Sequence, residues 1–150
     1  LWTRDPEPTV LPACRALGIT LVPFSPLGRG FLTGAVRRRE DLGEKDYRRT
    51  IPRFDEANFE ANLAQLAVLE DLAGAKGCST AQIALAWLIA QGEDIVPIPG
   101  TRKVAHLEDN VAALELSLGA EELAALERAF AGGAAAGERY KPAGLARVNR

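Results

Sequence analysis

The stretch Ile19-Thr20-Leu21-Val22-Pro23-Phe24, followed by Ser25-Pro26-Leu27-Gly28-Arg29-Gly30, decides the fold class. The first part is an almost unbroken apolar run of strand length, which is typical of a parallel strand buried on both faces. The second part is rich in proline and glycine, which end a strand in a turn. A short helix over residues 8–17, begun by a proline and ended by a glycine, precedes the strand. This order predicts an α/β protein with a parallel sheet.

A second buried strand is predicted at residues 95–98, and it runs directly into the turn Pro99-Gly100-Thr101-Arg102-Lys103. Apolar residues at helical spacing follow the turn, so a helix is expected there. Leu107 is expected to face inward on this helix and His106 to face outward. The two strands therefore belong to repeated strand, turn and helix units.

Three further helices follow from periodicity and capping signals. Apolar residues at three- and four-residue spacing predict an amphipathic helix from residue 59 to about residues 74–77. Ser79 and Gln82 form a capping box for a buried helix over residues 80–91, and a last helix starts near Gly119. Residues 1–7 resemble the end of a strand. Residues 25–57 lack periodicity, and this long loop is expected to be either a lid over a ligand or a solvated surface excursion.

Composition excludes several classes of protein. The chain has 150 residues, 47% of them hydrophobic and 25% charged, with a formal net charge of −2. These values indicate an ordinary globular domain without the basic field that nucleic acid or an anionic membrane surface attracts. The sequence shows no apolar run of membrane-spanning length and no secretion signal. Cys14 and Cys78 are expected to be reduced packing thiols. We therefore expect a cytoplasmic protein with no nucleic-acid or membrane partner.

The turns after both strands have the chemistry of an anion site. The carboxyl ends of parallel strands form the binding face of α/β proteins. Hydroxyl and cationic side chains gather there, namely Ser25, Thr101, Arg102 and Lys103. The helix that begins after the second turn adds its amino terminus, which favours phosphate. The alternative is that these are ordinary turns with solvated charges.

The sequence lacks the motifs of several common nucleotide-binding and catalytic sites. Neither GxGxxG nor a Walker loop is present, which argues against a Rossmann domain and a nucleotide triphosphatase. His106 is the single histidine, so no zinc site or Ser-His-Asp triad is expected. It is either a solvated residue or a residue at the edge of a ligand. Tyr47 and Tyr140 have no identifiable proton-transfer partner.

Four ordered motifs nevertheless resemble the carboxyl-terminal half of the aldo-keto reductases. They are Leu1-Trp2-Thr3-Arg4, the segment from Phe24 to Gly34, the segment from Ala81 to Leu88, and Ile98-Pro99-Gly100-Thr101-Arg102 with Glu108-Asp109-Asn110. The resemblance implies an eight-stranded (β/α) barrel that binds extended NADPH at the carboxyl ends of its strands. Residues 1–150 are then a partial (β/α)8 TIM barrel, roughly the last three βα units plus a C-terminal helix, and the C-terminal part of an NADP-dependent oxidoreductase domain.

The resemblance also implies roles for individual residues. Phe24 takes the place of the ring that stacks on the nicotinamide, which is usually a tyrosine, and Trp2 lies near the substrate opening. The pyrophosphate side is implied for Ser25, Pro26, Leu27, Gly28, Gly30 and, in their continuation, Leu32. The 2′-phosphate and adenine side is implied for Gly100, Thr101, Arg102, His106, Asp109 and Asn110. Many members of the family have a lysine where this chain has Gly100. The resemblance therefore implies that Arg102 supplies the positive charge that binds the 2′-phosphate.

The family's catalytic Asp, Tyr, Lys and His come from the first half of the barrel, and none can be placed in this chain. We therefore expect the NADPH-binding portion of an enzyme that reduces aldehydes or ketones to alcohols, inactive as the isolated chain and carrying no metal. It is expected to self-associate or to pair with a missing N-terminal half. One competing hypothesis is a non-catalytic dinucleotide-binding or regulatory module. Another is a phosphate-binding piece of an unrelated barrel enzyme.

Overall fold

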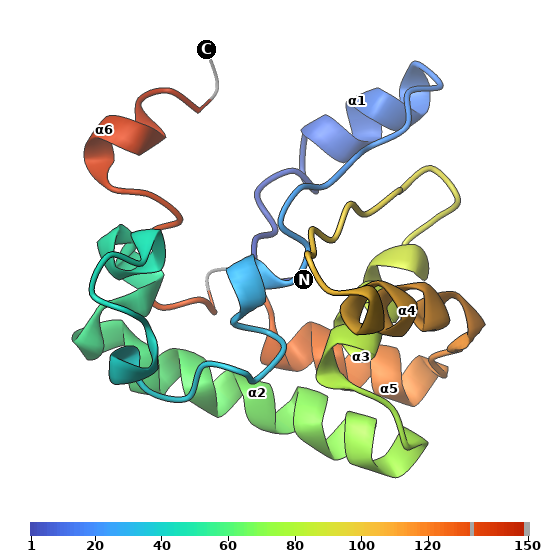
Figure 1. The fold of residues 1–150 in the computed structure, drawn as a ribbon. Helices are drawn as coiled ribbons and strands as arrows, with labels where there is room; N and C mark the ends of the chain where they lie inside the picture. The colour runs from blue at the N-terminus through green and yellow to red at the C-terminus, as the bar shows by residue number, and fades with distance from the viewer. Residues whose placement is uncertain (133, 149–150) are drawn as a thin grey trace.

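The computed structural model describes residues 1–132 and 134–148 as helices joined by long irregular segments (Figure 1). The α-helices are α1 (Val10–Ala16), α2 (Glu56–Lys76), α3 (Thr80–Ile89), α4 (Val104–Ala112), α5 (Ala120–Ala129) and α6 (Pro142–Leu145). Short 3-10 turns lie at η1 (Gly28–Gly30), η2 (Arg39–Asp41), η3 (Tyr47–Thr50), η4 (Pro52–Phe54) and η5 (Ala113–Glu115). Helices α2, α3 and α5 pack together, whereas α1 stands apart from them.

The helix boundaries follow the predicted capping signals. Helix α2 ends where Gly77 adopts a left-handed conformation at φ 64°, which closes the last turn at little steric cost. Helix α3 begins with the predicted capping box, because the Ser79 hydroxyl accepts from the Gln82 backbone N–H and the Gln82 side chain accepts from the Ser79 N–H. Gly119 precedes α5 as expected, and its N–H donates to Glu122 over 2.6 Å. The predicted packing helices are confirmed.

The predicted strands are wrong as continuous elements. Segments 19–24 and 95–98 run side by side in parallel, but within the described residues they form only isolated bridges, between Leu21 and Ile95 and between Phe24 and Ile98. The Val96 N–H donates to the Leu21 carbonyl over 3.0 Å. Pro23 and Pro97 each lack the N–H that a continuous ladder requires. The direction of pairing was predicted correctly and the extent of regular structure was not.

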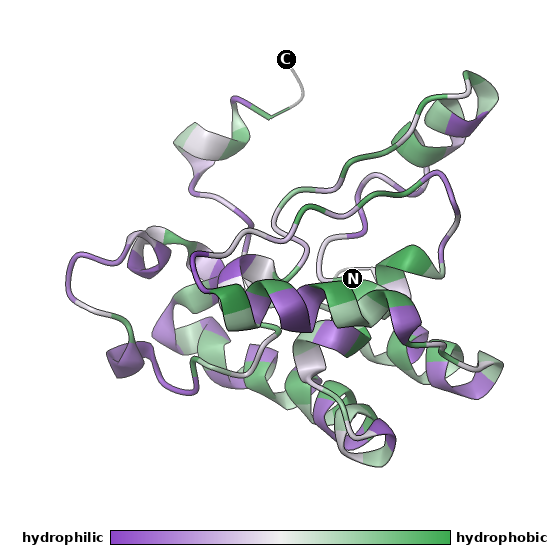
Figure 2. Ribbon diagram, turned by 45° about the vertical axis from the view of Figure 1, so that its right-hand side comes forward, coloured by the Kyte–Doolittle hydropathy of each residue, from purple (hydrophilic) through white to green (hydrophobic). Residues whose placement is uncertain are grey.

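The prediction that both faces of these segments are buried is also wrong. Alternate side chains stay about half exposed, 57% for Phe24 and 52% for Val22. The two segments run beside each other from the end of the molecule where α1 lies toward the packed helices, and Figure 2 colours much of this region as hydrophobic. Since a second layer is needed to bury the other face of a sheet, the described chain covers one face only.

Helix α4 leaves its apolar face in solvent, contrary to the expectation for Leu107. The exposed fractions are 72% for Val104, 53% for Leu107 and 55% for Val111, and Leu114 in the following η5 is 67% exposed. The helix is amphipathic as predicted, but its apolar stripe finds no partner element in the described part of the chain. The spacing of apolar residues predicts that a helix has an apolar stripe. It does not predict whether another element packs against that stripe.

The long segment at residues 25–57 is built into the core, so a purely solvated excursion is ruled out. Phe31 and Phe54 are almost fully buried. The ring of Trp2 stacks on Phe31 with centroids 4.6 Å apart, and Phe54 meets Phe31 edge-on at 5.5 Å. Such aromatic pairs contribute beyond their buried area. This cluster anchors the irregular segment beside the amino terminus, and both border the site described below.

Asn62 on α2 holds the chain that follows α5. This fully buried amide donates to the carbonyls of Arg53 and Ala136 over 3.0 and 2.9 Å, and its oxygen accepts from the Ala136 N–H over 2.8 Å. Nearby, the Gln65 side chain bonds the Ala134 carbonyl. The glycine- and alanine-rich tail, which the sequence presents as small and polar, is therefore docked along α2.

Asn62→Ala is expected to destabilise the protein, because it leaves buried backbone groups at Arg53 and Ala136 without partners. An unsatisfied buried group costs about 1–3 kcal/mol. Urea unfolding followed by circular dichroism measures the change. Glu60→Ala, on the exposed side of the same helix, is the control and should change stability little. Equal stability of Asn62→Ala and the wild type would show that water replaces these bonds.

Candidate functional site

A groove of about 560 Å³ opens between the turn after residue 24 and the start of α4. Nine of the residues expected to bind cofactor line it: Ser25, Pro26, Leu27, Gly30, Gly100, Thr101, His106, Asp109 and Asn110. They come from two turns about 75 residues apart in sequence and from α4, which follows the second turn, and the parallel bridges hold the two turns side by side. The structure thus brings most of the expected set into one cavity, which we call the groove.

Other expected residues lie elsewhere. Phe24, Gly28 and Trp2 line a second cavity next to the groove. Leu32 is fully buried and supports the turn from behind, so its side chain offers no surface to a ligand. Arg102 is exposed and does not line the groove, although its neighbour Thr101 does.

The turn before α4 is closed by its own hydrogen bond and leads into the first N–H groups of the helix. The Thr101 hydroxyl accepts from the Lys103 backbone N–H over 3.1 Å, which stabilises the turn locally. The Leu107 N–H donates to the Lys103 carbonyl over 3.1 Å, so the N–H groups of residues 104–106 come before the first backbone bond of α4. Such orphan N–H groups and the helix dipole favour an anion. Arg102 lies in the same turn, so charge and dipole act in the same direction.

Asp109 is held by α3. Its Oδ2 accepts from the Ser79 hydroxyl over 2.8 Å, and its backbone carbonyl accepts from the Gln82 side chain over 3.1 Å. The capping box that starts α3 therefore also orients one wall of the groove. The sequence reveals the box, but its link to Asp109 depends on the packing of α3 against α4.

Arg29 and Arg48 also line the groove, and neither was among the residues expected from the sequence to bind cofactor. Arg48 reaches it from η3 and donates to the Arg29 carbonyl over 3.1 Å. Its guanidinium also pairs with Asp46 at 2.8 Å, and that hydrogen bond lowers the pKa of the Asp46 carboxyl although partial burial opposes the shift. Arg29 lies within the quoted segment from Phe24 to Gly34, whereas Arg48 lies in no recognised motif. The one local signal is the abundance of arginine in this loop.

The backbone of the first turn is strained where it faces the cavities. Ser25 and Arg29 have positive φ, 49° and 57°, a conformation that side-chain-bearing residues rarely adopt. Strain of this kind often accompanies ligand sites. Gly28 is required in the same turn, since at φ 59° a Cβ there would lie 2.6 Å from the Trp2 ring.

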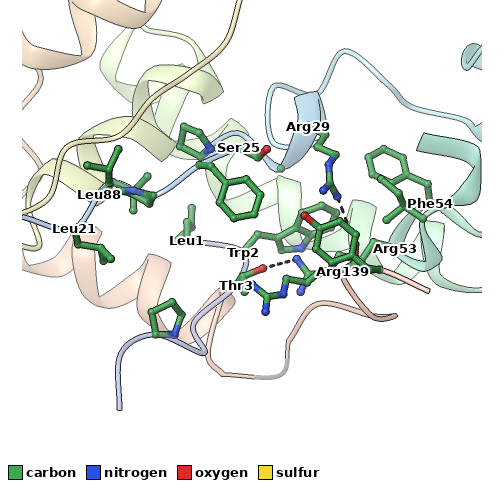
Figure 3. Close-up of a pocket in the computed structure, with 18 residues that line it drawn as sticks. Leu1, Trp2, Thr3, Leu21, Ser25, Arg29, Arg53, Phe54, Leu88 and Arg139 are labelled. Atoms are coloured by element: carbon green, nitrogen blue, oxygen red, sulfur yellow. Dashed lines mark hydrogen bonds between the residues drawn. The ribbon is translucent and has the colours of Figure 1, made fainter. Parts of the chain in front are cut away.

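The second cavity, which we call the pocket, has a volume of about 280 Å³. Phe24 and Trp2 line it, and Figure 3 shows the Trp2 ring among the labelled side chains. The indole N–H of Trp2 donates to the Gln65 side chain over 3.0 Å, and the Arg53 guanidinium lies 4.9 Å from the ring. The pocket is therefore small, largely aromatic and aliphatic, and continuous in sequence with the groove through the turn after residue 24.

The cysteines lie outside both cavities. Cys14 and Cys78 are free and half-buried, and Cys78 packs against the core as expected. Burial raises the pKa of the Cys78 thiol although the neighbouring Lys76 opposes the shift. A raised pKa leaves less of the reactive thiolate at neutral pH.

Comparison with known proteins identifies the family. The model of the Aldo/keto reductase family matches residues 1–131. The chain is 43% identical to aldo-keto reductase yakc [NADP(+)] of Schizosaccharomyces pombe over 142 residues, which cover 95% of this chain and 42% of that protein. This protein belongs to the aldo/keto reductase family, and it spans less than half the length of that relative.

Solved structures of two family members resemble the fold. Glycerol dehydrogenase AKR11B4 from Gluconobacter oxydans matches with a TM-score of 0.76 and 29% identity, covering 85% of this chain and 38% of that one. The thermostable aldo-keto reductase Tm1743 matches with a TM-score of 0.59 and 32% identity, covering 84% and 35%. No helix in the described residues is long and apolar enough to cross a membrane.

Proposed function

We propose that this chain is the NADPH-binding portion of an aldo-keto reductase that reduces aldehydes or ketones to alcohols. In this assignment the groove holds the phosphate and adenine side of NADPH, Phe24 stacks on the nicotinamide, and the pocket takes the carbonyl substrate. NADPH supplies the hydride when bound. The catalytic Asp, Tyr, Lys and His expected of the family would come from residues outside these 150.

The observation that carries the proposal is the groove itself. Residues selected by family resemblance line one cavity, and its lining includes Thr101 and His106 on either side of the start of α4. The groove therefore offers backbone N–H groups and cations for phosphate oxygens, as an extended dinucleotide requires. The name of the yeast relative carries NADP(+), which supports this cofactor.

A fluorescence titration of the purified chain with NADPH, and with inorganic phosphate in parallel, tests the proposal. We expect saturable NADPH binding that phosphate competes with only weakly, because phosphate lacks the adenine and nicotinamide contacts. Exposed Glu121→Gln on α5 is the control and should bind as the wild type does. Equal affinity for phosphate and NADPH would instead favour a phosphate-binding piece of an unrelated kind.

A non-catalytic dinucleotide-binding or regulatory module is the second candidate. It shares the groove, and it is favoured by the fact that none of the family's catalytic Asp, Tyr, Lys and His can be placed within these 150 residues. The coding sequence upstream of residue 1 would distinguish the two candidate functions. An in-frame segment that encodes the missing Asp, Tyr, Lys and His supports the enzyme, and a segment without them supports the module.

We further propose that the apolar face of α4 and the exposed side of residues 19–24 are contact surfaces, for a second copy or for an N-terminal half of the barrel. In sedimentation velocity we expect the chain to self-associate. Leu107→Lys should weaken association roughly tenfold or more, since burying a leucine contributes about 1.5–3 kcal/mol. Glu108→Lys, on the same helix, is the control. A monomeric wild-type chain at high concentration would contradict self-association.

A further inference from the structure

The pocket carries three guanidinium groups at one end. Arg29, Arg53 and Arg139 all line it, and Figure 3 shows them together, opposite Leu21 and Leu88. They come from η1, from η4 and from the tail docked on α2, so no sequence motif connects them. Folding alone gives the pocket an apolar end and a cationic end.

These cations are incompletely neutralised within the described residues. Arg139 pairs with Asp5 at 3.5 Å, and the Asp5 side chain is 71% exposed. Arg29 and Arg53 form no ion pair among residues 1–132 and 134–148. Arg53 donates instead to neutral oxygens, the Thr3 hydroxyl at 2.8 Å and the Gly137 carbonyl at 3.3 Å. The cluster therefore retains excess positive charge.

Two further observations indicate that the cluster is prepared for a ligand. The Nε of Arg139 is buried with no hydrogen-bond partner in the part of the chain that the structure describes. Burial lowers the pKa of Arg53, and the charges of Arg139 and Arg29 add to that shift although Asp5 and Glu138 oppose it. Unpaired buried donors are costly, so an anion at this position would satisfy groups that the protein leaves open.

Aromatic rings hold the guanidinium groups in place. Arg53 lies over Trp2 at 4.9 Å, and Arg29 lies over Tyr140 at 4.8 Å. Stacking on a ring occupies the face of a guanidinium and not its in-plane N–H donors. Arg53 uses two of these donors for Thr3 and Gly137, and Arg29 uses one for the Arg139 carbonyl. The fork geometry of the remaining donors matches a carboxylate.

We propose that the cationic end of the pocket binds the carboxylate of the substrate, so that the substrate is an aldehyde or ketone carrying a carboxylate group. The inference rests on the proposed reductase function and narrows its substrate class. The hydrocarbon part of such a compound fits the apolar residues beside Phe24.

Calorimetric titration of the chain with benzoate and with uncharged benzamide, at constant ionic strength, tests the proposal. We expect benzoate to bind more tightly than benzamide. Arg139→Gln should weaken benzoate roughly tenfold to a hundredfold and leave benzamide unchanged, because charge-assisted bonds to the guanidinium are lost. Arg128→Gln is the matched control, since Arg128 is exposed on α5 and lines neither the groove nor the pocket.

A thermal melt of each variant separates binding from folding. If Arg139→Gln does not fold, Arg53→Lys keeps the charge while losing the planar fork, and it should weaken benzoate several-fold. No preference for benzoate in the folded wild type, or equal losses for both probes in the variants, would overturn the proposal. A loss of NADPH affinity equal to the loss of benzoate affinity would also overturn the proposal, because it would show that the arginines bind the cofactor phosphates.

NADPH titration of the same samples keeps the two hypotheses distinguishable. If NADPH binds and benzoate shows no preference, the carboxylate subsite fails and the reductase assignment stands. If benzoate binds selectively and NADPH does not bind, the anion site stands as a binding site. Its assignment to a reductase substrate then fails.

Discussion

The 150-residue chain supplied with NADPH and benzaldehyde is expected to oxidise no NADPH above the rate measured without protein. Carbonyl reduction requires a positioned acid as well as a hydride donor, and general acid catalysis is typically worth about 10²- to 10⁴-fold. The chain's tyrosines are the candidate proton donors to exclude. Tyr47 is 59% exposed and lines neither cavity. Tyr140 borders the pocket beneath the Arg29 guanidinium.

Absorbance at the NADPH band, recorded with the wild type, Tyr47→Phe and Tyr140→Phe, provides the measurement. All three proteins should give the same background rate. Turnover that disappears in Tyr140→Phe would identify a proton donor in the pocket and contradict the assignment of catalysis to residues outside this chain. Turnover unaffected by either substitution would contradict it as well, because the acid would then lie elsewhere in these 150 residues.

Arg102→Ala is expected to weaken NADPH about 10- to 150-fold and to leave NADH nearly unchanged. Only NADPH carries the 2′-phosphate, and hydrogen bonds to charged groups contribute roughly 1.5–3 kcal/mol. Arg102 is exposed in the turn before α4, where the free helix N–H groups also favour an anion. Its exposure means that the substitution removes a ligand contact without disturbing the core.

Fluorescence titration of both dinucleotides measures the effect. Lys103→Ala is the matched variant, because Lys103 lies next in the same turn and a solvated lysine should give much less than a tenfold change. Equal losses of NADPH and NADH in Arg102→Ala would show that the residue supports the turn and has no specific role at the phosphate. A larger loss in Lys103→Ala would move the phosphate contact to that residue.

The sequence was most informative where chemistry is local. Ser79 and Gln82 predicted the start of α3, and Gly77 closes α2 where the apolar period stops. Caps depend on a few neighbouring residues, so they can be read without knowledge of the rest of the fold. The two turns of the groove were predictable for the same reason, since proline and glycine mark them and the family motifs lie within them.

Burial was the property that the sequence predicted least well. Phe24, Val22 and Leu107 have the apolar character of core residues, yet about half of each side chain is exposed. An apolar side chain reports a preference for burial, and whether that preference is met depends on which other elements lie against it. Conversely, Phe31 and Phe54 lie in a segment without periodicity and are nevertheless buried. Both rings pack against Trp2, Phe31 by stacking and Phe54 edge-on.

The sequence by itself determined the helices, their caps, the two glycine turns and the family to which the chain belongs. Only the tertiary structure decided that two segments pair in parallel without forming continuous strands, that Asn62 docks the tail, and that Arg29, Arg53 and Arg139 meet at one pocket. The physical reason is the range of the interactions. Caps and turns depend on bonds between residues a few positions apart, whereas the pocket depends on side chains from η1, η4 and the tail, which are separated by up to 110 positions and are brought together only by packing.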